Sequence, residues 1–230
     1  MRAQGRPFEG LTRDTIQDYM VARLRSGGGT RPALLLIQDR GHHAILKDYL
    51  PASWLLRALV GPWLIGREER IYRVLDGVPG VPRLIGRLDR HALVVERIDG
   101  RACSEYPDGS LPPEFFERLE TVVDGIHAHG VVHCDIKNRS NIVVTDDLDP
   151  YIVDFASAFT REGRLGPLRR FAFERFRIDD QRAVVKARLL VGRIWNDADE
   201  HFAFHHGPAE RTVRALRNGA RWLFKALARH

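Results

Sequence analysis

The sequence predicts an α+β protein of two lobes, with a small β-rich lobe first and a mostly helical lobe after it. Apolar runs of strand length at residues 33–37 and 44–47 flank the turn residues Asp39, Arg40 and Gly41, which is typical of a β-hairpin. From Ser110 onward, apolar residues recur at helical spacing. Strands early and helices late therefore predict two unlike lobes.

Composition is that of an ordinary soluble protein of 230 residues, with 44% hydrophobic and 29% charged residues. The two cysteines are far apart and lack CxxC spacing, which favours reduced thiols in the cytoplasm. The first residues contain no apolar signal-peptide core. The net charge of +6 implies acidic partners, but aromatic residues do not interleave with the basic runs, so no nucleic acid is expected.

Apolar residues between positions 11 and 24 have the spacing of a short amphipathic helix, and three glycines at 27–29 come after it. Residues 1–30 are accordingly predicted to be an N-terminal helix and a glycine linker. Residues 31–99 would form the first lobe and residues 100–230 the second, with the boundary near Asp99 and Gly100.

The first lobe is predicted to continue with a helix over residues 67–75 and a strand over 93–96. The apolar stretch at 52–66 is too short to span a membrane, and Arg57 and Pro62 interrupt it. In the second lobe, Pro112 and Pro113 suit the first turn of a helix that runs to Gly130.

The chemistry of the chain concentrates in residues 133–141, which contain Asp135, Lys137 and Asn141, and in the strand end that carries Asp154. This order of groups suits phosphoryl transfer. Asp135 would orient an attacking hydroxyl and accept its proton, and Lys137 would neutralise the moving phosphoryl group. Asn141 and Asp154 would supply oxygen ligands for Mg²⁺.

Residues 133–141 and 152–155 resemble the catalytic loop and the DFG segment of the protein-kinase superfamily. Together with residues 77–84, 93–96 and 153–158, they make the chain similar, over about residues 33–195, to small bacterial kinases of the lipopolysaccharide-core (Kdo/heptose) group. RIO-type kinases are more distant relatives. The resemblance implies a two-lobed protein-kinase-like fold and the cofactors ATP and Mg²⁺. We call residues 133–141 the catalytic loop.

The resemblance also assigns residues of the first lobe. Lys47, at the end of a strand, would contact the α- and β-phosphates of ATP, supported by Glu68 on the next helix; Glu69 is the alternative. Glu68 is preferred because it shares a helix face with apolar residues that would bury it. The backbone of Glu96 and Ile98 would contact adenine.

Three departures from the kinase pattern stand out. One extra residue separates Asp135 from Asn141, which leaves Asn138 as an alternative magnesium ligand. Ala156 comes after Phe155 where the pattern has glycine. No GxGxxG motif precedes Lys47, and the triple glycine is weak evidence for a phosphate-binding loop. A nucleotide-binding pseudokinase is therefore one alternative.

The acceptor is predicted from the residues that come after Asp154. No Ala-Pro-Glu motif closes an activation segment, so a sugar or glycolipid hydroxyl is favoured over a protein side chain, and a RIO-like serine/threonine kinase is the alternative. Asp179 or Asp180 would brace the catalytic loop or cap the next helix. Six arginines could bind an acidic acceptor: Arg161, Arg164, Arg169, Arg170, Arg175 and Arg177.

The last residues of the chain have the pattern of a basic amphipathic helix. Between residues 209 and 230, apolar side chains line one helical face and arginines the other. Such a helix can lie on an anionic membrane surface. We expect a cytoplasmic protein that associates peripherally with the inner face of the cytoplasmic membrane.

Overall fold

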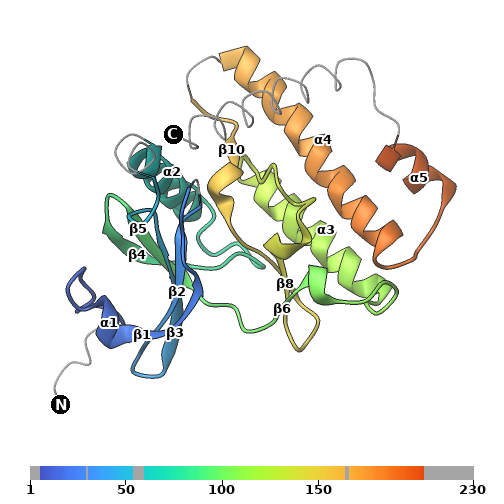
Figure 1. Cartoon of the computed structure of the whole chain (residues 1–230). Helices are drawn as coiled ribbons and strands as arrows, with labels where there is room; N and C mark the ends of the chain where they lie inside the picture. The colour runs from blue at the N-terminus through green and yellow to red at the C-terminus, as the bar shows by residue number, and fades with distance from the viewer. Residues whose placement is uncertain (1–5, 30, 54–59, 164–165, 205–230) are drawn as a thin grey trace. The chain divides into compact units, whose positions relative to one another are not determined.

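The computed structural model describes residues 6–29, 31–53, 60–163 and 166–204 (Figure 1). The chain divides into two compact units. Of the described residues, the first unit holds residues up to 70 together with 83–97, and the second holds 71–82 and everything from 98 on. The predicted basic C-terminal helix and the centre of the apolar stretch at 52–66 lie outside the described residues.

The first unit is built on a five-stranded antiparallel sheet with the order β1-β2-β3-β5-β4. Its strands are β1 (Met20–Arg25), β2 (Ala33–Asp39), β3 (His42–Asp48), β4 (Leu84–Asp89) and β5 (Ala92–Glu96). The predicted hairpin is confirmed as β2 and β3. Its turn residues Arg40 and Gly41 both have positive φ, which matches the right-handed twist of the strands.

The two faces of this sheet are covered differently. On one face, Phe8 and Ile16 of the N-terminal segment pack against Leu46 of β3 and Val94 of β5. On the other, Ile65 of α2 (Gly61–Val74) packs with Leu93 of β5, Tyr49 and Ala52. Successive side chains of a strand point to opposite faces. Lys47 therefore lies on the α2 face, and Asp48 lies on the face that the N-terminal segment covers.

Arg13 ties this N-terminal segment to the sheet. Its guanidinium donates to both carboxylate oxygens of Asp48, at 2.5 and 3.0 Å, and to both of Asp89, at 2.7 and 2.9 Å. Asp89 also accepts the backbone N–H groups of His91 and Ala92. The Arg13 guanidinium lowers the pKa of the Asp89 carboxyl to about 2. One arginine thus links the N-terminal segment, the end of β3 and the β4–β5 turn.

Two predictions for the first unit need correction, and one strand was not predicted. The helix predicted over residues 11–24 is wrong, because only α1 (Ile16–Tyr19) is helical and residues 20–25 pair with β2 as β1. The helix predicted from residue 67 begins at Gly61, since a proline in the first turn loses no helical hydrogen bond. Strand β4 was missed: its polar residues and Gly86 hide the alternation of a strand.

The second unit is mostly helical, as predicted. Its described residues include the end of α2 and three further helices: α3 (Pro113–Ala128), α4 (Gly166–Leu190) and α5 (Asp197–Phe204). The predicted helix after Pro112 is confirmed as α3, which buries Phe116, Leu119, Val123 and Ile126 along one face. Among the described residues, no helix is long and apolar enough to cross a membrane.

Short strands and 3₁₀ turns of the second unit frame the predicted site. The strands are β6 (Arg101–Ala102), β7 (Val131–Val132), β8 (Ile142–Val144), β9 (Pro150–Ile152) and β10 (Phe159–Thr160). They form a three-stranded sheet, β6-β8-β9, and a two-stranded one, β10-β7. The catalytic loop connects β7 to β8, and Asp154 comes after β9, so the predicted strand–loop–strand order is confirmed.

Candidate active site

A buried carboxylate on α4 anchors the catalytic loop. Asp180 accepts the backbone N–H of His133 through Oδ2, at 2.6 Å, and that of Cys134 through Oδ1, at 2.9 Å. His127 of α3 approaches the same Oδ2 with Nε2 at 3.3 Å. The sequence leaves both Asp179 and Asp180 as candidates for bracing the loop, and the residue that does so is Asp180. Because Asp180 lies inside the 25-residue α4, it does not cap a later helix.

His133 joins the loop to the segment that carries Asp154. The Asp135 N–H donates to His133 Nδ1 at 3.3 Å, so the ring hydrogen is on Nε2, which donates to the Val153 carbonyl at 3.1 Å. The ring also packs edge-on against Phe155, with ring centroids 5.0 Å apart. This side chain is fully buried and holds both segments through its backbone and ring contacts.

Asp135 and Asn141 are in contact despite the extra residue between them. The Asn141 Nδ2 donates to the Asp135 carbonyl at 3.1 Å and to its Oδ2 at 3.2 Å. A 3₁₀ turn over Arg139–Asn141 takes up the additional residue. Asn138 caps this turn by accepting the Ser140 N–H. The bond to Asp135 orients the Asn141 amide, and its Oδ1 accepts a hydrogen bond from Asn138 Nδ2 at 3.4 Å. An amide oxygen has two lone pairs, so one of them remains for a cation.

Asp154 has a left-handed backbone with φ of 66°, which is uncommon for a residue other than glycine. Its Oδ1 accepts the Ala156 N–H at 3.4 Å and caps the 3₁₀ turn over Phe155–Ser157. The Val153 N–H donates to the Asn141 carbonyl at 2.9 Å, so the β8–β9 pairing brings Asn141 and Asp154 to the same end of this sheet. An amide oxygen and a carboxylate there fit the hard oxygen ligands that Mg²⁺ prefers.

Lys137 lies two residues after Asp135 and is exposed. Sequence reasoning placed it beside the γ-phosphate of ATP, a role that stays a prediction. The intervening Ile136 is buried, which fixes the backbone between the two polar residues.

In the first unit, Lys47 and Glu68 form a buried ion pair. The Nζ of Lys47 lies 2.9 Å from each carboxylate oxygen of Glu68, and the two residues are 5% and 1% exposed. The alternative partner, Glu69, instead binds Arg87 at 3.1 Å. Burial at this level requires that each charge keep its partner, since an unpaired buried charge costs several kcal/mol. The pair fixes the end of the Lys47 side chain.

The two residues predicted near adenine lie at the end of β5 and just after it. The Glu96 carboxylate accepts hydrogen bonds from the backbone N–H of Arg83, at 3.0 Å, and from its guanidinium. The Glu96 N–H donates to the Arg83 carbonyl at 2.9 Å. Ile98 lies in an irregular segment two residues later. Their adenine contacts stay predictions.

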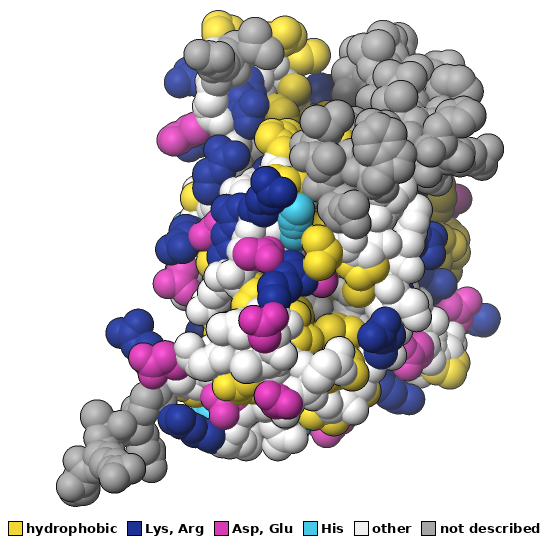
Figure 2. All heavy atoms as spheres, turned by 60° about the vertical axis from the view of Figure 1, so that its left-hand side comes forward, with side chains coloured by type: hydrophobic (Ala, Val, Ile, Leu, Met, Phe, Trp, Pro, Cys, Tyr) yellow, Lys and Arg dark blue, Asp and Glu magenta, His cyan; other side chains and the backbone are white. Residues whose placement is uncertain are grey.

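Some of the arginines assigned to an acidic acceptor already have partners. Arg169 donates to the carbonyl and hydroxyl of Thr160, both at 2.8 Å, and Arg177 pairs with Glu174 at 2.8 Å. Arg164 lies outside the described residues. On the face seen in Figure 2, Lys and Arg side chains are interspersed with Asp and Glu rather than gathered in one patch.

The antiparallel sheet carrying a Lys–Glu ion pair, and the helical unit carrying an anchored catalytic loop, define a protein-kinase-like fold. The predicted fold class is confirmed. The backbone is similar to the crystal structure of the Rio2 kinase from Chaetomium thermophilum, with a TM-score of 0.57, 16% sequence identity, and coverage of 86% of this chain. This chain spans only 62% of that kinase.

The similarity to solved structures defines the fold and goes no further. No protein-family model matches the sequence, and no curated protein sequence is similar to it. At the same time, 1225 chains of solved structures match the backbone, so the fold alone does not single out one substrate. The predicted closeness to lipopolysaccharide-core kinases stays a prediction.

Proposed function

We propose that this protein is an ATP- and magnesium-dependent phosphotransferase that moves the γ-phosphate of ATP to a hydroxyl group. The observation that carries the proposal is the 3.2 Å hydrogen bond from Asn141 to the Asp135 carboxylate. It supports the view that the unusual spacing of the catalytic loop leaves a carboxylate and a metal-binding amide side by side.

In the proposed reaction, the acceptor oxygen forms a bond to the γ-phosphorus while the bond from that phosphorus to the departing ADP oxygen breaks. Asp135 orients the acceptor hydroxyl and takes its proton. Lys137 neutralises the transferred group, and Lys47, held by Glu68, contacts the α- and β-phosphates. Asn141 and Asp154 would hold Mg²⁺, which would neutralise charge on the phosphate oxygens.

We propose a sugar or glycolipid hydroxyl as the acceptor. The support is the short connection after Asp154: α4 begins at Gly166, and β10 occupies part of the interval by pairing with β7. This leaves little chain to form a platform for a peptide substrate. Arg170 is exposed and has no partner among the described residues, so it is a candidate contact for an acidic acceptor.

A RIO-like serine/threonine protein kinase is the second candidate, favoured by the similarity to the Rio2 kinase fold. The two are separated by incubating the protein with labelled ATP and either lipid and sugar extracts or protein extracts. A rise of the protein's own intact mass, or label only in proteins, would favour the second candidate. Label in a lipid or sugar fraction would favour the first.

The roles are tested by two substitutions with a matched control. Asp135→Ala is expected to keep ATP binding and to lose turnover by about 10²- to 10⁴-fold, the usual contribution of a positioned base. Asp154→Ala is expected to lose magnesium-dependent ATP binding. Asp147→Ala, at an exposed carboxylate in the β8–β9 turn, should change neither. Full activity in either of the first two variants, or no ATPase rate in the unaltered protein, contradicts the proposal; the latter result favours a pseudokinase.

We further propose that the protein is cytoplasmic and binds the anionic inner face of the cytoplasmic membrane through residues 209–230. The support is the basic amphipathic pattern of this segment. Flotation with anionic liposomes, using the full chain and a chain that ends at residue 208, tests it. Equal flotation of the two proteins would contradict the proposed membrane binding.

A further inference from the structure

Helices α3 and α4 pack side by side and carry one polar contact at each end of their shared seam. At one end, His127 of α3 meets Asp180 of α4 at 3.3 Å, and both side chains are almost fully buried. At the other, Glu120 of α3 meets Arg188 of α4 at 3.7 Å, nearer to solvent. Residue numbers rise along α3 from 120 to 127 while those of their partners on α4 fall from 188 to 180, so the two helices run antiparallel.

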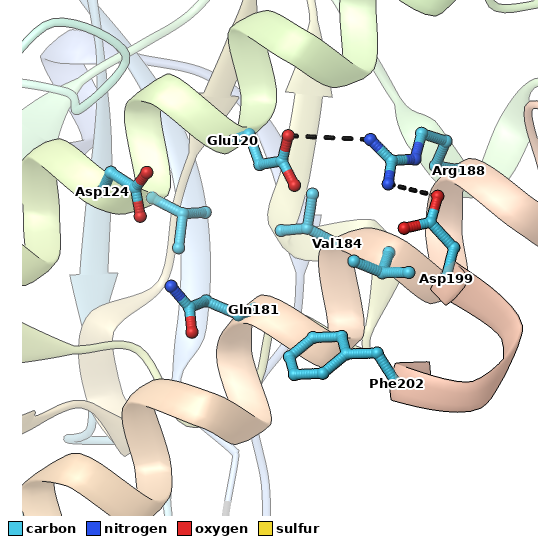
Figure 3. A pocket seen from close by; sticks show the side chains of 9 residues that line it. Glu120, Asp124, Gln181, Val184, Arg188, Asp199 and Phe202 are labelled. Atoms are coloured by element: carbon cyan, nitrogen blue, oxygen red, sulfur yellow. Dashed lines mark hydrogen bonds and ion pairs between the residues drawn. The ribbon is translucent and has the colours of Figure 1, made fainter. Parts of the chain in front are cut away.

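Between these two contacts the seam is not filled. A cavity of about 290 Å³ opens there, and α5 closes its side (Figure 3). Valine side chains from both helices and the ring of Phe202 on α5 form its apolar part. Asp124 and Gln181 stand at one end, and Arg188 with its carboxylate partners stands at the other.

The charge of the lining is acidic. Among the residues that line the cavity, Arg188 is the one cation, and it already binds Asp199 and Glu120. A second guanidinium, that of Arg182, lies 5.3 Å from the centre of the Phe202 ring. Asp124 is exposed and has no partner among the described residues of the chain. The lining thus holds three carboxylates and one arginine, and the carboxylate that Arg188 does not pair with, Asp124, lies at the other end of the cavity. A ligand that matches this lining carries a positive group on an apolar body.

We propose that this cavity binds a small organic cation, an ammonium group attached to an apolar body, with the ammonium at Asp124 and the body against Val184 and Phe202. Its volume is at the low end for small-molecule sites, which restricts the ligand to about the size of an arylalkyl amine. The inference does not depend on the phosphotransferase proposal.

A ligand in the cavity can affect the catalytic loop through Asp180, which anchors that loop. Gln181 comes directly after Asp180 on α4, and Asp124 lies one helical turn before His127 on α3. A ligand with its ammonium at Asp124 of α3 and its body against Val184 of α4 thus holds the two helices together next to the His127–Asp180 contact. Asp180 is also the acceptor for the His133 and Cys134 N–H groups. Occupancy of the cavity therefore stabilises the anchor of the loop.

The ligand class is tested by calorimetric titration of the full chain with three probes of similar shape: 2-phenylethylammonium, 2-phenylethanol and phenylacetate. The ammonium is expected to bind with a dissociation constant on the order of 1 mM, more tightly than the alcohol and the carboxylate. Asp124→Asn should weaken the ammonium about twofold to fivefold, the range for an exposed charge pair. Glu114→Gln, an exposed carboxylate of α3 outside the cavity, should not.

The proposal is overturned if none of the probes binds, if alcohol and ammonium bind equally, or if Asp124→Asn leaves the affinity unchanged. The path to the loop has its own readout, the amide hydrogen exchange of His133 and Cys134. At ten times the dissociation constant, the ammonium should slow their exchange by up to about tenfold, with less change in β8. Unchanged exchange at these two amides, or equal slowing throughout the second unit, contradicts the path through Asp180.

Discussion

Replacing Asp180 by alanine should destabilise the second unit and detach the catalytic loop from α4. The carboxylate is 2% exposed and accepts two backbone N–H groups, at 2.6 and 2.9 Å. Without it, the N–H groups of His133 and Cys134 are buried with no acceptor, at a cost of about 1–3 kcal/mol each. The total, about 2–6 kcal/mol, is a large part of the ~5–15 kcal/mol that stabilises a typical domain.

Asp180→Asn separates the loss of hydrogen bonds from the loss of side-chain volume. The amide keeps one acceptor oxygen but points its N–H hydrogens at the second backbone donor. The free energy of unfolding of Asp180→Asn should therefore lie between that of the unaltered protein and that of the alanine variant. Urea unfolding measured by near-ultraviolet circular dichroism gives the free energies, with Glu117→Gln on the exposed face of α3 as the control. A loss below about 1 kcal/mol in Asp180→Ala would refute the anchoring role.

Two further predictions concern an ion pair in the first unit and two glycines in the second. Arg13 lowers the pKa of Asp89 to about 2, so the pair stabilises the protein fully above about pH 4 and loses its effect as pH falls from about 4 to 2. Arg13→Gln should therefore make the free energy of unfolding depend less on pH in that window. An unchanged pH dependence would contradict the pairing. Gly77 and Gly80 both have left-handed φ near 80°, but only at Gly80 would a Cβ meet a neighbour, Val122 at 2.4 Å. Gly77→Ala should therefore cost about 1–2 kcal/mol for backbone strain alone, and Gly80→Ala clearly more; equal melting temperatures would show that the contact relaxes freely.

Much of the second unit could be predicted from sequence because its signals are local. The catalytic loop keeps its polar residues within nine positions, and α3 combines a proline at its start with apolar residues at helical spacing. The choice of Glu68 over Glu69 also came from a local rule, since only one of two adjacent helix positions can face the buried side.

The parts that sequence reasoning missed depend on residues far apart in the chain. Met20 to Arg25 have a spacing that fits either a helix or a strand, and pairing with β2 decides for the strand. Arg13 meets Asp48 and Asp89 across 35 and 76 positions, and no local pattern indicates such a contact. The sequence leaves two candidates, Asp179 and Asp180, for the residue that braces the catalytic loop. It cannot choose between them, because the N–H groups that Asp180 accepts lie 46 and 47 residues away.

The N-terminal segment has a practical consequence for producing this protein. The glycines at 27–29 invite a truncation that begins the chain near β2. Such a shortened protein would lose Phe8 and Ile16, which cover one face of the sheet, and also β1, which pairs with β2 at the edge. The exposed face and the unpaired edge would favour aggregation. Expression designs should keep residues 6–25. A solubility tag should be added before these residues and should not replace them.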